Sequence, residues 1–167
     1  SILGGPLVAL GVMTSIAIFC SIPASLLWGY LCDATRHYKV FILISFLSSA
    51  ILLFLMALPF AQSIIPFVIL YVVMQVLHVS HEAPKNVLIA EHYSREDWEK
   101  SYGFYEGVTE IGFIIGLAIG LVMVSLSSTV LATYALYLCS VWSVVALVLS
   151  IGLVGDPLLV FERRWGG

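Results

Sequence analysis

Residues 1–32 read SILGGPLVALGVMTSIAIFCSIPASLLWGYLC, a stretch without a single charged side chain. The usable apolar run covers residues 6–31 and ends just before Asp33. A bilayer has a hydrocarbon core of about 30 Å, which an α-helix crosses with about 20 apolar residues. The stretch therefore predicts a transmembrane helix. It is too long for a cleaved secretory signal, and it lacks the basic start and the small-residue cleavage site of one.

The rest of the chain has the same character. Hydrophobic residues make up 61% of the 167 residues, charged residues make up 10%, and the mean hydropathy is +1.08. Soluble domains have about 45–50% apolar and about 25% charged residues, so most of this surface must face lipid. We predict an all-α fold, a polytopic transmembrane bundle of about five spans, because runs of this length are twice as long as barrel strands. The spans after the first are residues 40–58, 64–84, 103–125 and 130–154, followed by a tail at 155–167.

The basic residues predict the orientation of the bundle. All seven lie in the loop after the first span, around the loop after the third span, or in the C-terminal tail. The two remaining loops, residues 59–63 and 126–129, contain none. Cytoplasmic loops of membrane proteins are enriched in Lys and Arg. We therefore expect an integral, multi-pass protein of the plasma or cytoplasmic membrane with a cytoplasmic C-terminus.

Several classes of function are not expected. The net charge of −3 provides no basic stripe for nucleic acid. The three cysteines are far apart, without metal-ligand or redox spacing. The sequence His78-x-x-His81-Glu82 lacks the order of the zinc protease motif and an evident third ligand. We expect no metal, no cofactor and no enzymatic activity, and membrane lipid as one partner.

Polar residues inside the third span are the first candidates for a functional site. Gln75, His78 and Glu82 are spaced by three and four residues, which places them on one stripe of a helix. Polar groups at this depth face the bundle interior, where a solute or a coupling ion passes. The same pattern also fits hydrogen bonds that only hold helices together. Both interpretations remain open from the sequence.

Two carboxylates lie inside the fourth span. Glu106 and Glu110 are one helical turn apart and share a face. Reflecting the helical hairpin about Asp97 places Lys85 level with Glu110, which predicts a structural ion pair between them. The alternative is a proton or cation relay, because two neighbouring acids favour protonation of one of them.

The fourth span is also rich in glycine. Such spacing predicts close contact between helices, since small residues let two backbones approach. The residues expected in this contact are Gly112, Gly116 and Gly120.

The junction of the first two spans resembles a known family signature. Gly29-Tyr30-Leu31-Cys32-Asp33 is followed by Arg36 and Lys39, and this is similar to the loop between the second and third helices of the major facilitator superfamily. The likeness continues in order with Gln75, Pro84, Ala90-Glu91, the turn at 94–97 and the glycine-rich span that starts near Gly103. The resemblance implies helices two to six of a six-helix N-terminal bundle. Helix one and a C-terminal bundle would then be further partners.

The resemblance implies a function as well. Such a protein performs secondary active or facilitative transport of a small solute by alternating access, with a proton or sodium as candidate coupling ion. Gly29, Asp33, Arg36 and Lys39 would form a cytoplasmic gate, in which Asp33 pairs with Arg36 and caps a helix of the other half. The substrate or coupling-ion candidates are Gln75, His78, Glu82, Glu106 and Glu110. A scaffold or receptor of the same fold that does not transport is the alternative.

Departures from the family pattern narrow this expectation. Ala34 stands where the signature has Arg after its Asp, and Arg36-His37-Tyr38 replaces the Gly-Arg that follows. The Arg of the family's fourth helix falls on Val72, and the Pro of its antiporter motif falls on Leu117. These departures therefore favour uniport or symport over antiport.

Overall fold

The computed structural model describes residues 5–92, 94, 97–125 and 129–155, and in these the chain is helical without any strand. Long apolar runs form helices here because a helix satisfies every backbone polar group within its own segment. The main helices are α1 (Gly5–Thr35), α2 (Tyr38–Met56), α3 (Ile64–His78), α4 (Glu82–His92), α5 (Trp98–Ser125) and α6 (Thr129–Leu153). Two short 3₁₀ turns, η1 (Pro59–Gln62) and η2 (Val79–His81), precede and follow α3.

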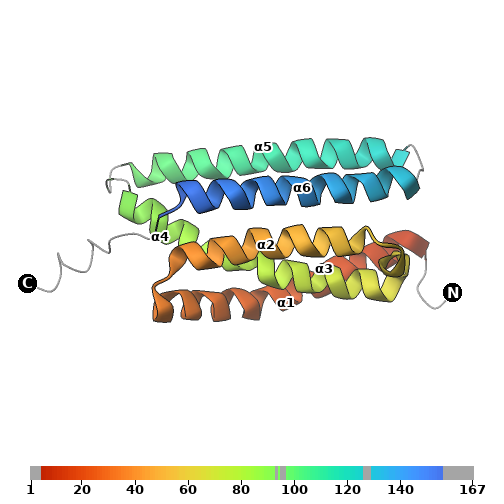
Figure 1. Ribbon diagram of the computed structural model, residues 1–167, viewed down its shortest axis with the longest axis horizontal. Helices are drawn as coiled ribbons and strands as arrows, with labels where there is room; N and C mark the ends of the chain where they lie inside the picture. The colour runs from red at the N-terminus through yellow and green to blue at the C-terminus, as the bar shows by residue number, and fades with distance from the viewer. Residues whose placement is uncertain (1–4, 93, 95–96, 126–128, 156–167) are drawn as a thin grey trace, which may run out of the picture.

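The long helices lie side by side along one axis (Figure 1). α2 is central and packs against both α3 and α6, while α1 packs against α3. The buried face of α2 contains small and aromatic residues, among them Tyr38, Phe41, Ser45 and Ala50. α5 runs beside α6 in Figure 1, but the contacts of α5 with α6 and α4 are few. The packed core is therefore formed by α1, α2, α3 and α6, and α5 lies at its edge.

Four helical stretches among the described residues are long and apolar enough to cross a bilayer. They are Gly11–Thr35, Tyr38–Met56, Ile64–Ala90 and Val130–Leu153. Four of the five expected spans are thereby found, and the third is longer than expected because α4 continues it. The expected span at 103–125 is helical and forms most of α5, but its second half includes side chains outside the described part of the chain, so this span stays a prediction.

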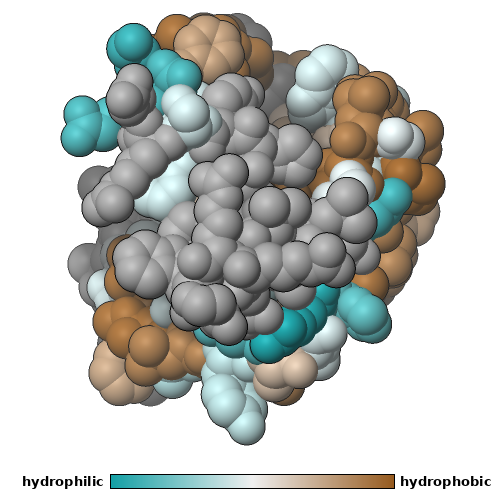
Figure 2. Space-filling model, turned by 90° about the vertical axis from the view of Figure 1, so that its left-hand side faces the viewer, coloured by the Kyte–Doolittle hydropathy of each residue, from teal (hydrophilic) through white to brown (hydrophobic). Residues whose placement is uncertain are grey.

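The surface of the bundle is largely apolar. Residues on α1, α5 and α6 such as Phe19, Phe104 and Trp142 are about three-quarters exposed. In water such a surface would be unstable, so lipid or further protein must cover it. Figure 2 shows the end of the molecule where α1 ends and α5 begins. Hydrophilic residues are visible there between hydrophobic patches on the sides.

Candidate functional site

The third apolar stretch is one long helix with a break in its middle. α3 ends at His78, η2 forms a single 3₁₀ turn, and α4 begins at Glu82. Pro84 sits in the first turn of α4, where its lack of an N–H is tolerated, but it cannot bond to the carbonyl of Ser80 as a continuous helix requires. Pro84 therefore interrupts the helix at membrane depth. Such an interruption is stable in a bilayer only where protein groups form hydrogen bonds with the backbone groups that it leaves unpaired.

Side chains from α1 and α2 bond to backbone carbonyls just before the break. The indole Nε1 of Trp28 donates to the carbonyl of Val76 at 2.7 Å, and Ser45 Oγ donates to the carbonyl of His78 at 2.9 Å. Ser80, which is fully buried, donates its hydroxyl to the carbonyl of Phe41 at 3.0 Å. These contacts hold the broken helix against both neighbours.

His78 faces α2. Its Nδ1 lies 3.1 Å from Ser45 Oγ and 3.1 Å from Ser49 Oγ. Gln75, one turn earlier, does not share these contacts, and its amide donates instead to the hydroxyl of Tyr71 at 3.0 Å. The two residues expected on one stripe therefore have different surroundings. His78 joins helices through hydrogen bonds, and Gln75 faces an open groove.

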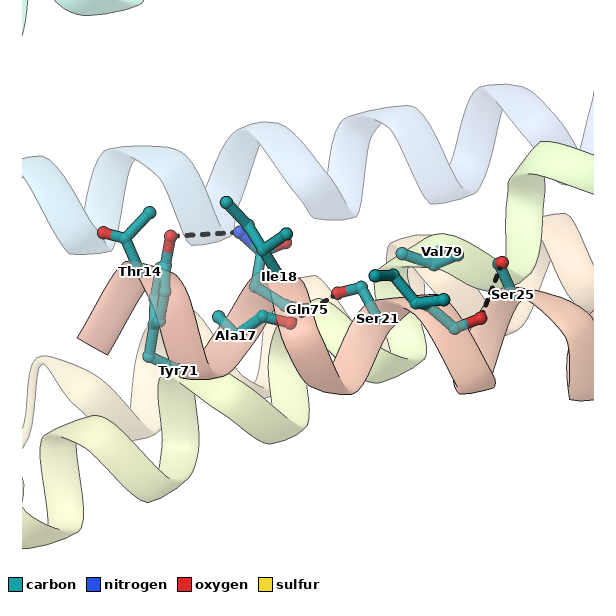
Figure 3. Close-up of a pocket in the computed structure, with 9 residues that line it drawn as sticks. Thr14, Ala17, Ile18, Ser21, Ser25, Tyr71, Gln75 and Val79 are labelled. Carbon is teal, nitrogen blue, oxygen red and sulfur yellow. Dashed lines mark hydrogen bonds between the residues drawn. The ribbon is translucent and has the colours of Figure 1, made fainter. Parts of the chain in front are cut away.

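The groove lies between α1 and α3 and has a volume of about 480 Å³. Figure 3 shows Tyr71 and Gln75 on α3 opposite the polar residues of α1. None of its lining residues carries a charge: they are Thr14, Ala17, Ile18, Ser21, Ile22, Ser25, Tyr71, Gln75 and Val79. The sequence analysis did not single out Thr14, Ser21, Ser25 or Tyr71. A signal was present, since spacings of seven and four put Thr14, Ser21 and Ser25 on one helix face.

A cluster of charged side chains starts at the break and continues along α4 to the facing part of α5. His81 Nε2 is 3.2 Å from Glu82 Oε1, and Lys85 Nζ is 2.7 Å from Glu82 Oε2. Lys85 Nζ is also 3.1 Å from Glu106 Oε1. Its side chain is only 9% exposed, against 49% for Glu82 and 36% for Glu106, and the ring of Tyr105 lies 5.1 Å from Nζ. Lys85 is thus the buried centre of the cluster.

The predicted ion pair between Lys85 and Glu110 is wrong. Lys85 pairs with Glu106, one helical turn closer to the loop, and the side chain of Glu110 is exposed. The error comes from the reflection point. A hairpin that brings Lys85 level with Glu106 has its centre between residues 95 and 96, whereas the prediction used Asp97.

The expected glycine contact is not made within the described part of this chain. A Cβ placed on Gly112 or Gly116 would meet nothing within 4 Å. The reason is that α5 has no helix against this face in the described part of the chain. The surroundings of Gly120 lie outside the described side chains.

The residues of the signature loop occupy the end of α1 and the start of α2. A Cβ on Gly29 would find open space, and Asp33 is exposed in the last turn of α1. Arg36 has a φ of 57°, and its N–H donates to the carbonyl of Cys32 at 2.9 Å. A left-handed residue in this position ends a helix, usually as glycine.

Lys39 has a role that the sequence did not suggest. Its Nζ donates to the carbonyl of Ile151 at 2.7 Å. Ile151 lies in the last turn of α6, where backbone carbonyls have no partner within the helix and the helix dipole favours a cation. Lys39 therefore joins the start of α2 to the end of α6.

Comparison with known proteins agrees with this architecture. The sequence matches the family model of the Major Facilitator Superfamily over residues 1–161. No curated protein and no solved structure matches the chain. Members of this family are transporters, and the apolar helices indicate an integral, multi-pass membrane protein. The chain belongs to the Major Facilitator Superfamily.

Proposed function

We propose that this chain is part of the N-terminal bundle of a secondary transporter, corresponding to helices two to six of that bundle. The transporter moves a small solute by alternating access, either by facilitated diffusion or by symport with a proton or sodium. The remaining helices of the same protein complete the pathway. In the proposed orientation the C-terminus and the loop at Arg36 are cytoplasmic, in agreement with the distribution of the basic residues.

The groove between α1 and α3 is the observation that carries this proposal. It lies along the middle of two apolar helices, and it combines an amide, a phenol and three aliphatic hydroxyls with apolar side chains. Ligand sites are typically of this kind, apolar with a few polar groups that fix orientation. Polar groups at membrane depth usually face the interior of a bundle or a water-filled cavity, and this supports a solute pathway beside Gln75.

The lining also indicates the class of solute. A charged solute that leaves water needs an opposite charge or strong hydrogen bonds to compensate for its lost hydration. None of the side chains that line the groove is charged. We therefore propose an uncharged solute that carries hydroxyl or amide groups, with Gln75 as its principal hydrogen-bonding partner.

The charged residues have separate proposed roles. Asp33 and Arg36 belong to the cytoplasmic gate together with Gly29 and Lys39. His78, Glu82, Glu106 and Glu110 remain candidates for coupling, because carboxylates and imidazoles are the groups that carry protons or bind cations in transporters. Of the carboxylates, Glu110 is exposed on α5 without an ion pair in the described part of the chain, whereas Glu82 and Glu106 share Lys85.

A thermal-shift screen of the full-length protein in detergent tests the solute site. We expect sugars, polyols or nucleosides to raise the unfolding temperature, while carboxylates and ammonium compounds of the same size do not. A ligand at 100 times its dissociation constant stabilises the folded state by about 2.7 kcal/mol. Gln75→Leu should abolish this shift. The control Ser15→Ala should retain it, since Ser15 is exposed, bonds to the carbonyl of Gly11 and lies outside the groove.

Counterflow of the stabilising solute in proteoliposomes tests transport itself. Exchange that is lost in Gln75→Leu and retained in Ser15→Ala is the expected result. A shift that persists in Gln75→Leu would mean that the solute binds elsewhere. Binding without exchange would identify a receptor or scaffold.

A further inference from the structure

The ring of His81 has an acceptor opposite each of its nitrogens. Nδ1 faces the carbonyl oxygen of His78, which can only accept, so Nδ1 carries a hydrogen. Nε2 lies 3.2 Å from the carboxylate oxygen of Glu82. A neutral imidazole with its hydrogen on Nδ1 presents a lone pair at Nε2. Two acceptors would then face each other, unless a proton lies between them.

The charges around this contact give the proton a further effect. With the proton bound, His81 and Lys85 balance the carboxylates of Glu82 and Glu106. Without it, Lys85 alone faces two carboxylates, at 2.7 Å and 3.1 Å. An unbalanced charge is costly in a partly desolvated site, and Lys85 is almost completely buried.

The titratable groups that face the cluster come from several elements. The His78 ring of α3 lies 4.7 Å from the His81 ring, and α5 contributes Tyr102 and Tyr105 beside Lys85. α1 and α2 pack Cys32 and Tyr38 near Ala83 and Val87 of α4. Of these neighbouring groups, none supplies a second carboxylate to the Nε2 side of His81, so Glu82 is the partner of the proton.

We propose that the contact between His81 and Glu82 is a proton-binding site whose occupancy sets how firmly Lys85 holds α5 to α4. The step is a simple acid–base reaction, in which Nε2 of His81 takes a proton from water and no other bond changes. The protonated His81 then compensates Glu82, which leaves the charge of Lys85 to Glu106. Loss of the proton makes Glu82 and Glu106 compete for Lys85, and this weakens the contact between α4 and α5.

Regulation of transport by this site rests on the proposed function, but the site itself does not. α5 has few contacts with the other helices in the described part of the chain, and its polar contacts with α4 include the ion pair of Lys85 with Glu106 and the hydrogen bond from Trp98 Nε1 to the carbonyl of Ala90. Proton uptake at the break in the third span would therefore change how firmly α5 is held to α4. A transporter built in this way responds to pH without placing the proton in the solute groove.

The distance between α4 and α5 can be measured without any solute. Spin labels are attached to Asn86→Cys on α4 and Gly103→Cys on α5 in the full-length protein in lipid nanodiscs, after Cys20, Cys32 and Cys139 are changed to Ala. Both positions are exposed, and a side chain on Gly103 finds open space. We expect a narrow distance distribution at pH 5.5 and a broader, longer one at pH 8.5. His81→Gln and Glu82→Gln should each abolish this response, whereas Glu99→Gln, an exposed acid on α5, should retain it.

Each other outcome overturns the proposal. A distance that does not depend on pH would show that no such site exists. A pH response that survives in folded His81→Gln or folded Glu82→Gln would assign it to another group, and one of the two variants suffices for this decision. Loss of the response in Glu99→Gln would mean that any acid near the two helices produces it. Because no solute is present, failure here leaves the transport proposal intact, and failure to find a solute leaves the proton site intact.

Discussion

Lys85 Nζ lies 3.1 Å from Glu106 Oε1, and this ion pair joins α4 to α5. The same nitrogen lies 2.7 Å from Glu82 Oε2 on its own helix. Lys85 is buried while both carboxylates are partly exposed. Removing Lys85 should therefore lower the stability of the fold more than removing either carboxylate. The ion pair of Lys85 is one of the polar contacts between α4 and α5, beside the hydrogen bond from Trp98 Nε1 to the carbonyl of Ala90.

Lys85→Met should lower the free energy of unfolding by about 1 to 3 kcal/mol. The estimate is lower than for a fully buried pair, because both carboxylates are partly hydrated. Unfolding in sodium dodecyl sulfate measures the change. The triple variant Lys85→Met, Glu82→Gln, Glu106→Gln should recover most of the loss, since it leaves no unpaired charge.

Glu110→Gln is the matched control for that experiment. Glu110 is one turn from Glu106 on the same helix, and it is exposed. We expect a change within about 0.5 kcal/mol, as for most surface substitutions. An equal loss in Glu110→Gln and Glu106→Gln would contradict the assignment of Glu106 as the partner of Lys85.

Much of the fold could be predicted from the sequence, because bilayer thickness fixes the length of an apolar helix. Asp33 and Pro59 also mark where the first two apolar runs end. The third span was predicted as a single segment, and its break at Val79–His81 was not predicted, although Pro84 was visible in the sequence. The partner of Lys85 was missed by one turn, because helical periodicity does not give the register between two helices joined by a turn. The glycine contact at Gly112 stays a prediction, because spacing alone does not identify a packing partner and none lies within 4 Å of it in the described part of the chain.

Trp28→Phe should cost about 1 to 2 kcal/mol of stability. The phenyl ring can keep the edge-on contact with Phe41, but the carbonyl of Val76 loses its donor, and an unsatisfied partly buried acceptor costs about this much. Trp142→Phe serves as the comparison, because Trp142 is 74% exposed. Equal effects of the two substitutions would show that the hydrogen bond to Val76 contributes nothing.

Arg36→Gly should raise the free energy of unfolding by about 0.5 to 1 kcal/mol. A non-glycine residue in the left-handed region costs about 1 to 2 kcal/mol, and the greater freedom of glycine in the unfolded chain offsets part of the gain. His37→Gly should instead lower stability, because His37 has an ordinary φ of −103°. If both substitutions destabilise the protein, Arg36 is held by contacts stronger than its backbone strain.

Asp33→Asn should slow transport by about tenfold without changing the unfolding temperature. Asp33 is exposed, so its loss empties no core, and a factor of ten corresponds to about 1.4 kcal/mol, the size of one hydrogen bond to a charged group. Turnover of the stabilising solute in proteoliposomes measures this. Unchanged turnover at equal protein content would exclude Asp33 from the gate.

The central claim is that a solute passes along the groove between α1 and α3 by alternating access, and cysteine alkylation at its two ends tests it most directly. Thr14 and Ser25 both line the groove, and eleven residues of helix separate them by about 16 Å. Thr14→Cys and Ser25→Cys are placed singly in the full-length protein without its native cysteines, and a membrane-impermeant maleimide is added from outside for the first and from inside for the second.

Adding the solute that stabilises the protein should change the two alkylation rates in opposite directions, because opening one end of the groove closes the other. Rates that both stay constant, or that both fall together, would show a binding site that does not alternate and would contradict the account.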